Sequence, residues 1–317
     1  MWTVDLRRAD PVNGQLTIAV IGAGLMGHGI AYLLARAGHS VRVFDTSEDA
    51  LASLRERLLG IAALLGDDPA LCDRAKPVPD MASAVDGAAL VIEAATENVP
   101  LKQKIFAELE ALCGPESILA SNTSSIPLKD IGANMKDTTR LVGAHFWNPP
   151  HLVPLVEVSQ LAEANLPAVQ KTIRILAAAG RHPVHVKRDI PGFIGNRLQH
   201  AIKREAIALV AEGICDAETI DDVVKMGFGK RMAVLGPMEQ LDLVGLDLTR
   251  AIHEVLLHDL DRSTGPHPFL LELIDSGKLG MDAGEGFRKW TPEQAAEVHR
   301  RLADYLVEPA RMAPGHD

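Results

Sequence analysis

The 317-residue sequence has little cysteine, no excess of positive charge and no long apolar run. The three cysteines, Cys72, Cys113 and Cys215, are scattered and lack Cys-x-x-Cys spacing, so we expect neither disulfides nor a bound metal. The formal net charge of −10 argues against a nucleic-acid partner. No apolar stretch reaches the roughly 18 residues of a membrane span, and the N-terminus has no signal-peptide core. We therefore expect a cytoplasmic protein without a membrane partner.

The best-defined pattern is Leu16–Asp45, which reads as a strand, a glycine loop, a helix and a second strand. The apolar run Ile18–Ile21 leads directly into G-x-G-x-x-G, the arrangement of a dinucleotide-binding fold. Gly22 would make the tight turn, Gly24 would let backbone N–H groups approach a pyrophosphate, and Gly27 would let the helix pack closely. The residues predicted to bind the cofactor in this loop are Gly22, Gly24, Leu25, Met26 and Gly27.

Asp45 ends the second strand, about 20 residues beyond the glycines. A carboxylate at this point accepts hydrogen bonds from both hydroxyls of the adenosine ribose, and it repels a 2′-phosphate. The sequence therefore predicts NAD rather than NADP as the cofactor. FAD proteins share the glycine pattern, and only residues further along the chain argue against FAD.

Strand and helix patterns alternate as far as the apolar segment 182–186, and every later segment reads as helix. We predict an α/β fold with three parts: a flexible extension at 1–15, a doubly wound Rossmann-type domain at 16–189, and an all-helical domain at 190–317. Two predicted strands end in polar clusters, at 95–98 and at 121–125. Ligands of such sheets bind beyond the carboxyl ends of the strands, so we expect Asn122 to contact the cofactor and Ser124 to contact the substrate.

His145 and Glu157 belong to two short predicted strands, Leu141–Phe146 and Val153–Val158. If these strands form an antiparallel pair centred on His151, the two side chains lie directly opposite each other on one face. A dehydrogenase needs a base for the alcohol proton and a group that orients that base. The pair would supply both functions, and Ser124 could donate a hydrogen bond to the substrate oxygen.

Several motifs resemble the L-3-hydroxyacyl-CoA dehydrogenase family: SNTSS at 121–125, GAHFWNPP at 143–150, PLVEV at 154–158, PGFIGNR at 191–197, GPMEQLDLVGLD at 236–247 and KLGMDAGEGF at 278–287. The resemblance implies an NAD-dependent oxidoreductase that transfers hydride at C3 of a (3S)-hydroxyacyl group in fatty acid metabolism. It also implies a helical domain that commonly forms a homodimer. By position, it assigns catalysis to His145 and Glu157, substrate-oxygen contacts to Ser124 and Asn196, and cofactor contacts to Glu97 and Lys102.

The departures from that family pattern leave the substrate open. The segment 47–68 offers only Arg55 and Arg57 for the phosphates of CoA, and NPPHLVPLVEV also resembles CoA-free relatives such as gulonate, carnitine and pyridine-carboxylate dehydrogenases. A 3-hydroxyacyl-CoA and a small hydroxy acid or aromatic alcohol or aldehyde acid are therefore both possible substrates. A third hypothesis is a crystallin-like NAD-binding protein without activity, which would be expected to lack His145 or Glu157.

Overall fold

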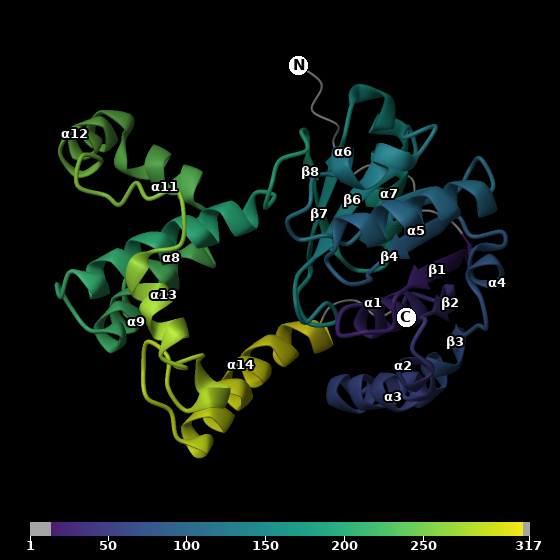
Figure 1. Cartoon of the computed structure of the whole chain (residues 1–317), viewed down its shortest axis with the longest axis horizontal. Helices are drawn as coiled ribbons and strands as arrows, with labels where there is room; N and C mark the ends of the chain where they lie inside the picture. The colour runs from purple at the N-terminus through teal and green to yellow at the C-terminus, as the bar shows by residue number, and fades with distance from the viewer. Residues whose placement is uncertain (1–13, 313–317) are drawn as a thin grey trace. The chain divides into compact units, whose positions relative to one another are not determined.

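The computed structural model of the chain describes residues 14–312, so nearly all of the expected extension at 1–15 lies outside the described residues. The chain divides into two compact units. The first unit holds the described residues up to Asn196 together with those from Ala303 on, and the second holds Arg197–Leu302. The division therefore falls within two helices, α8 (Gly195–Ala211) and α14 (Pro292–Met312) (Figure 1).

An eight-stranded sheet forms the centre of the first unit, in the order β3-β2-β1-β4-β5-β6-β7-β8. Its strands are β1 (Thr17–Ile21), β2 (Ser40–Phe44), β3 (Ala75–Pro77), β4 (Leu90–Glu93), β5 (Ile118–Ser121), β6 (Leu141–Phe146), β7 (Leu155–Gln160) and β8 (His182–Val186). All neighbours are parallel except β6 and β7, which pair antiparallel. The order reverses direction at β1, and the predicted doubly wound fold is confirmed.

Helices cover both faces of this sheet because its strands are apolar on both faces. In β1, Ile18 and Val20 belong to one core cluster, whereas Ala19 and Ile21 belong to the other. The first cluster includes side chains of α1 (Gly27–Arg36), α3 (Leu54–Leu65) and α7 (Leu166–Ala178). The second includes side chains of α4 (Met81–Val85), α5 (Val99–Leu112) and α6 (Leu128–Ile131).

Three details differ from the expected elements. The helical spacing of apolar residues over 47–65 predicts one helix, but the structure divides this segment into α2 (Glu48–Ala52) and α3, since the Ser53 hydroxyl donates to the carbonyl of Asp49 and interrupts the helix. The strand β3 lies in a proline-containing segment without a clear pattern. The end of α14 belongs to the first unit rather than to the helical one: Val307 and Ala310 are buried in its core, and Arg36 donates to the Ala310 carbonyl at 3.4 Å.

The second unit is helical. Besides its parts of α8 and α14 it contains α9 (Ala217–Met226), α10 (Phe228–Met232), α11 (Pro237–Val244), α12 (Leu246–Leu256) and α13 (Pro268–Asp275). All residues from 197 to 302 are described, and among them only Ala208 is buried. Large apolar side chains are exposed instead, among them Val234, Leu243 and Val255 at 89%, 73% and 74%. Within the described residues, no helix is both long and apolar enough to cross a membrane.

Candidate active site and cofactor cradle

The glycine loop between β1 and α1 has the geometry that its sequence requires. Gly22 has φ of 106°, and a Cβ there would lie 2.6 Å from the Ala94 carbonyl oxygen. A Cβ on Gly27 would overlap the carbonyl oxygen of Gly22, so only glycine allows α1 to approach this closely. Gly24, in contrast, faces open space, because nothing lies within 4 Å of a Cβ placed there. The two close-packed glycines thus shape the loop, and the third leaves room for a bound group.

A cavity of about 650 Å³ opens beside this loop. It is lined by Gly22, Gly24, Leu25, Met26 and Asp45, and also by residues that follow β4 and residues of α5. No side chain caps the first turn of α1. The N–H groups of His28 and Ile30 donate to backbone carbonyls, and the other N–H groups of this turn can bind an anion. The carboxylate of Asp45 accepts hydrogen bonds from the N–H of Ala23 at 2.6 Å and from that of Ser47 at 2.8 Å, which fixes it at the end of β2. These residues fit a dinucleotide with its pyrophosphate at α1 and a ribose at Asp45.

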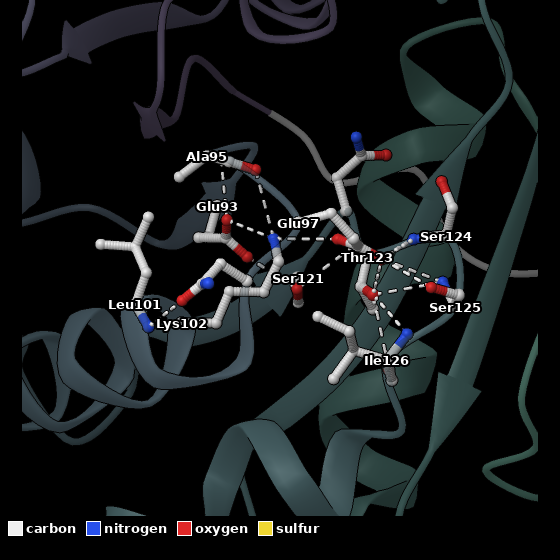
Figure 2. Close-up of polar contacts among 12 residues, drawn as sticks. Glu93, Ala95, Glu97, Leu101, Lys102, Ser121, Thr123, Ser124, Ser125 and Ile126 are labelled. Atoms are coloured by element: carbon white, nitrogen blue, oxygen red, sulfur yellow. Dashed lines mark hydrogen bonds and ion pairs between the residues drawn. The ribbon is translucent and has the colours of Figure 1, made fainter.

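Lys102 lies in a buried network of charges beyond β4 rather than on an open surface. Its ammonium is 2.7 Å from Glu93 and 3.4 Å from Glu97, and its side chain is only 1% exposed. The other carboxylate oxygen of Glu93 accepts the hydroxyl of Ser121 at the end of β5. Figure 2 shows the three charged side chains pointing toward one another. Glu93 therefore joins the ends of β4 and β5, and Lys102 balances its charge.

Glu97 extends this network to the loop that carries Ser124. One carboxylate oxygen accepts the Thr123 hydroxyl at 2.6 Å and the backbone N–H groups of Ser124 and Ser125 at 3.0 Å each (Figure 2). Burial alone would raise the pKa of Glu97, but the Thr123 hydrogen bond and the charge of Lys102 outweigh it and hold the pKa below its ordinary value. An ionised Glu97 thus holds the Thr123 hydroxyl and the backbone of Ser124 and Ser125.

His145 and Glu157 are paired residues on β6 and β7, which confirms the register predicted from their spacing. The imidazole Nδ1 lies 2.9 Å from a carboxylate oxygen of Glu157, and the two side chains are 5% and 1% exposed. The other carboxylate oxygen accepts the N–H groups of Ile194 and Gly195 at 2.8 and 3.0 Å, where α8 begins. The carboxylate is therefore fixed on both sides.

The surroundings of Glu157 keep it ionised. Burial alone would raise its pKa, but the hydrogen bonds from His145 and from the backbone of Gly195 and Ile194 outweigh burial and lower the pKa. The indole N–H of Trp147 also points at Glu157, at 3.3 Å. A carboxylate that only accepts requires Nδ1 of His145 to carry the proton. Nε2 is then left as the acceptor.

Ser124 and Asn196 are also brought together, since the Asn196 amide donates to the Ser124 carbonyl at 3.3 Å. Asn196 follows Gly195, whose N–H binds Glu157, so the start of α8 contacts both the Ser124 loop and the His145–Glu157 pair. The side chain of Asn122 accepts the N–H of Phe146 at 2.9 Å and is thereby engaged between β5 and β6. The structure thus brings the expected catalytic residues together near the ends of β5 and β6, whereas the glycine loop and Asp45 follow β1 and β2.

Phe193 is a site residue that the sequence did not indicate. Its ring stacks on His145, with centroids 4.8 Å apart and planes at 21°. It is 4% exposed and has φ of 51°, an uncommon conformation for a residue other than glycine. From the sequence, Pro191–Gly192–Phe193 reads as an ordinary turn. Only the position of Phe193 just before α8 could have indicated that it lies in the site.

The sheet, the glycine loop between β1 and α1, and Asp45 define an NAD-binding dehydrogenase fold. Residues 17–190 match the family model for the 3-hydroxyacyl-CoA dehydrogenase NAD binding domain, and residues 192–290 match the model for its C-terminal domain. The chain belongs to the 3-hydroxyacyl-CoA dehydrogenase family, whose members are NAD-dependent enzymes.

The relatives include a pyridine-carboxylate dehydrogenase and hydroxyacyl-CoA dehydrogenases. The chain is 37% identical to the 5-formyl-3-hydroxy-2-methylpyridine 4-carboxylate 5-dehydrogenase of Mesorhizobium japonicum, over 95% of this chain and 99% of that one. It is 36% identical to the human mitochondrial hydroxyacyl-coenzyme A dehydrogenase, over 86% and 90%. A crystal structure of the pyridine-carboxylate enzyme, described as an NAD⁺-dependent dismutase, is 36% identical with a TM-score of 0.85, covering 96% of this chain and 100% of that one. For (S)-3-hydroxybutyryl-CoA dehydrogenase from Ralstonia eutropha the identity is 32% and the TM-score 0.68, covering 88% and 100%.

Proposed function

We propose that this protein transfers hydride between NAD and the carbinol or carbonyl carbon of a small substrate, with His145 and Glu157 as its acid–base pair. The observation that carries the proposal is the buried contact of 2.9 Å between Nδ1 of His145 and Glu157. A structural histidine needs no ionised carboxylate fixed by two backbone N–H groups behind it. A base that becomes positively charged during the reaction does benefit from one.

Different residues of the chain carry out different parts of the reaction. In the oxidation direction, Nε2 of His145 takes the hydroxyl proton of an alcohol, or of the gem-diol that an aldehyde forms by adding water, as that C–O bond becomes a carbonyl. Glu157 stabilises the imidazolium that forms. The glycine loop and Asp45 would hold NAD, which would supply the hydride acceptor. Ser124 and Asn196 would donate hydrogen bonds to the substrate oxygen, and Glu97 keeps the Ser124 loop in place.

We further propose that the substrate is a small CoA-free aromatic alcohol or aldehyde acid. The two arginines of α3 that could meet CoA phosphates are already engaged: Arg55 pairs with Asp73 at 2.8 Å, and Arg57 donates to the Ala50 carbonyl at 2.6 Å. The similarity to the pyridine-carboxylate dehydrogenase also extends over nearly the whole of both chains. A (3S)-hydroxyacyl-CoA is the second candidate, favoured by the family models and by the hydroxyacyl-CoA relatives.

A spectrophotometric screen at the NADH band tests this proposal. We expect turnover with NAD and 5-formyl-3-hydroxy-2-methylpyridine 4-carboxylate, and much weaker turnover of acetoacetyl-CoA with NADH; gulonate and carnitine complete the panel. His145→Gln serves as the inactive control. Preference for acetoacetyl-CoA would show that the substrate is a hydroxyacyl-CoA rather than a CoA-free compound. A His145→Gln enzyme as active as the wild type would contradict the role of the acid–base pair.

We propose that the functional form is a homodimer joined through the helical part, residues 190–317, with residues 16–189 binding NAD. The supporting observation is that the helical unit has almost no core of its own. Its helices α9, α11 and α12 contain no buried residue and expose large apolar side chains. Exposed apolar surface of this extent is typical of an interface, and a second copy of the chain is the simplest partner.

A further inference from the structure

A second cavity, of about 580 Å³, lies wholly within the helical unit. One wall is a face of α8, and the other is the loop that leads into α13. Its ionisable lining side chains are Arg197, His200, Lys203, Arg204 and His267. No carboxylate lines it, although the whole chain has a formal net charge of −10. The cavity therefore concentrates positive charge in an otherwise acidic protein.

The helical repeat of α8 brings these cations together. Arg197, His200 and Arg204 are spaced three and four residues apart and so lie along one face of the helix. Leu198 and Ile202, the exposed apolar residues of α8 between them, lie on the opposite face, at 55% and 40% exposure. An interface formed by the apolar face would thus leave the basic face open.

The cations of this cavity are not neutralised by ion pairs. Lys203 donates to the neutral amide of Gln199 at 3.2 Å, and Arg204 donates to the Ser263 carbonyl at 3.4 Å. Across residues 197–302, all of which are described, no carboxylate lies within ion-pair distance of Arg197, Lys203 or Arg204. The pKa of the Asp261 carboxylate is lowered mainly by hydrogen bonds from Ser263. Asp261 is close enough for the charges of Arg204 and His267 to help lower this pKa, but it forms no ion pair with either side chain. The charged donors of the cavity can therefore still bind an anion.

The opposite wall is a preformed loop. The Asp261 carboxylate accepts both the N–H and the hydroxyl of Ser263 at 2.7 Å, which fixes the start of the loop and directs that carboxylate to its own backbone. Gly265 has no atom within 4 Å of the position where a Cβ would stand, so the wall is open at this point. Nδ1 of His267 accepts the N–H of Phe269, which leaves its Nε2 as a donor.

We propose that this cavity, the α8 basic pocket, binds the phosphate groups of a phosphorylated small molecule. Two guanidinium groups suit the planar, bidentate recognition of phosphate oxygens, and the Lys203 ammonium adds a point charge. The volume accommodates more than an isolated ion, so a pyrophosphate or a nucleotide phosphate chain fits better than a single carboxylate. The source is either the phosphate end of a CoA-type substrate or a free phosphorylated metabolite.

Calorimetric titration with inorganic pyrophosphate tests the pocket directly. Saturating NAD is present throughout, because it occupies the other anion site, at the start of α1. We expect binding to the wild type, and at least a roughly tenfold weaker affinity for Lys203→Gln/Arg204→Gln, since two charge-assisted contacts are lost. The control, Lys230→Gln/Arg231→Gln, removes the same charge from α10 and should bind like the wild type. If the double variant fails to fold, the single variant Lys203→Glu takes its place. It keeps the Arg204 contact with Ser263 and should weaken pyrophosphate binding by a similar factor.

Steady-state kinetics with acetoacetyl-CoA and NADH distinguish the two sources. Competitive inhibition by pyrophosphate, with a raised KM for acetoacetyl-CoA in Lys203→Gln/Arg204→Gln, identifies the phosphates as those of CoA. Binding that does not compete with substrate identifies a free phosphorylated ligand. No binding to the wild type, or equal binding to the pocket and control variants, overturns the site. Because binding is measured without turnover, these results stand apart from those that test the proposed reaction.

Discussion

The ammonium of Lys102 lies 2.7 Å from Glu93, and the two side chains are 1% and 0% exposed. Removal of one member of such a pair leaves the other charge buried without compensation. We therefore expect Lys102→Met to lower the free energy of unfolding by about 3–5 kcal/mol in urea titrations. Lys102→Met/Glu93→Gln should recover part of that loss, because it no longer buries a lone carboxylate. Lys104→Met, an exposed position on the same helix, is the control; equal effects at 102 and 104 would contradict the account.

Cofactor choice should depend on Asp45. A 2′-phosphate at this carboxylate would lose hydrogen bonds and meet like charge, so the wild type should prefer NAD over NADP by roughly 100-fold in kcat/KM. Asp45→Asn should narrow that preference, since the amide oxygen can still accept the N–H of Ala23 but carries no charge. Comparable efficiency of the wild-type enzyme with NADP would show that Asp45 does not meet the ribose.

Stability should fall on mild acidification because of His151. Burial, together with the nearby charges of His28 and Arg181, lowers the pKa of His151 from 6.5 to about 4. The unfolded chain therefore binds a proton between these values that the folded chain does not, and stability is lost as pH falls through this window. His151→Leu should flatten the dependence of unfolding free energy on pH between 6.5 and 4. An unchanged slope in His151→Leu would contradict the assignment.

The homodimer proposal predicts a dimer at micromolar concentration in light scattering. Val255→Asp places a charge on α12 at a side chain that is 74% exposed within the single chain. If a second copy covers it, the charge would be desolvated, and the variant should dissociate to monomers. Lys230→Gln, on an already polar side chain, should remain dimeric. A wild-type monomer would count against the proposal, as would a Val255→Asp variant that remains a dimer.

Much of the fold and one part of the site follow from local sequence physics. Strand-length apolar runs and the glycine loop predict the parallel sheet, and the spacing of His145 and Glu157 about His151 predicts their pairing. The burial of Lys102 could not be predicted in this way. Its compensation by Glu93 and Glu97 depends on how β4 and α5 meet, whereas a lysine in a helix ordinarily faces water.

Contacts between segments far apart in the chain could likewise not be predicted from the sequence pattern. The left-handed conformation of Phe193 and its stacking on His145 depend on the position of β6, about 50 residues earlier. The burial of Val307 in the core of the first unit depends on the return of α14, which its own amphipathic pattern does not reveal. A helical period gives the apolar face of a helix but not the surface that will cover it.

The central claim is that His145 and Glu157 act as one acid–base unit, and a double-mutant cycle on kcat tests it most directly. His145→Gln should lower kcat by about 10²- to 10⁴-fold with NAD affinity nearly unchanged, and Glu157→Gln should cost a similar factor, because an amide orients the ring but cannot balance its charge. Residues that share one task are not additive, so the double variant should be little worse than either single variant. Defects that multiply in the double variant, or a His145→Gln enzyme that retains most of its activity, would show that the pair is structural and that another group serves as the base.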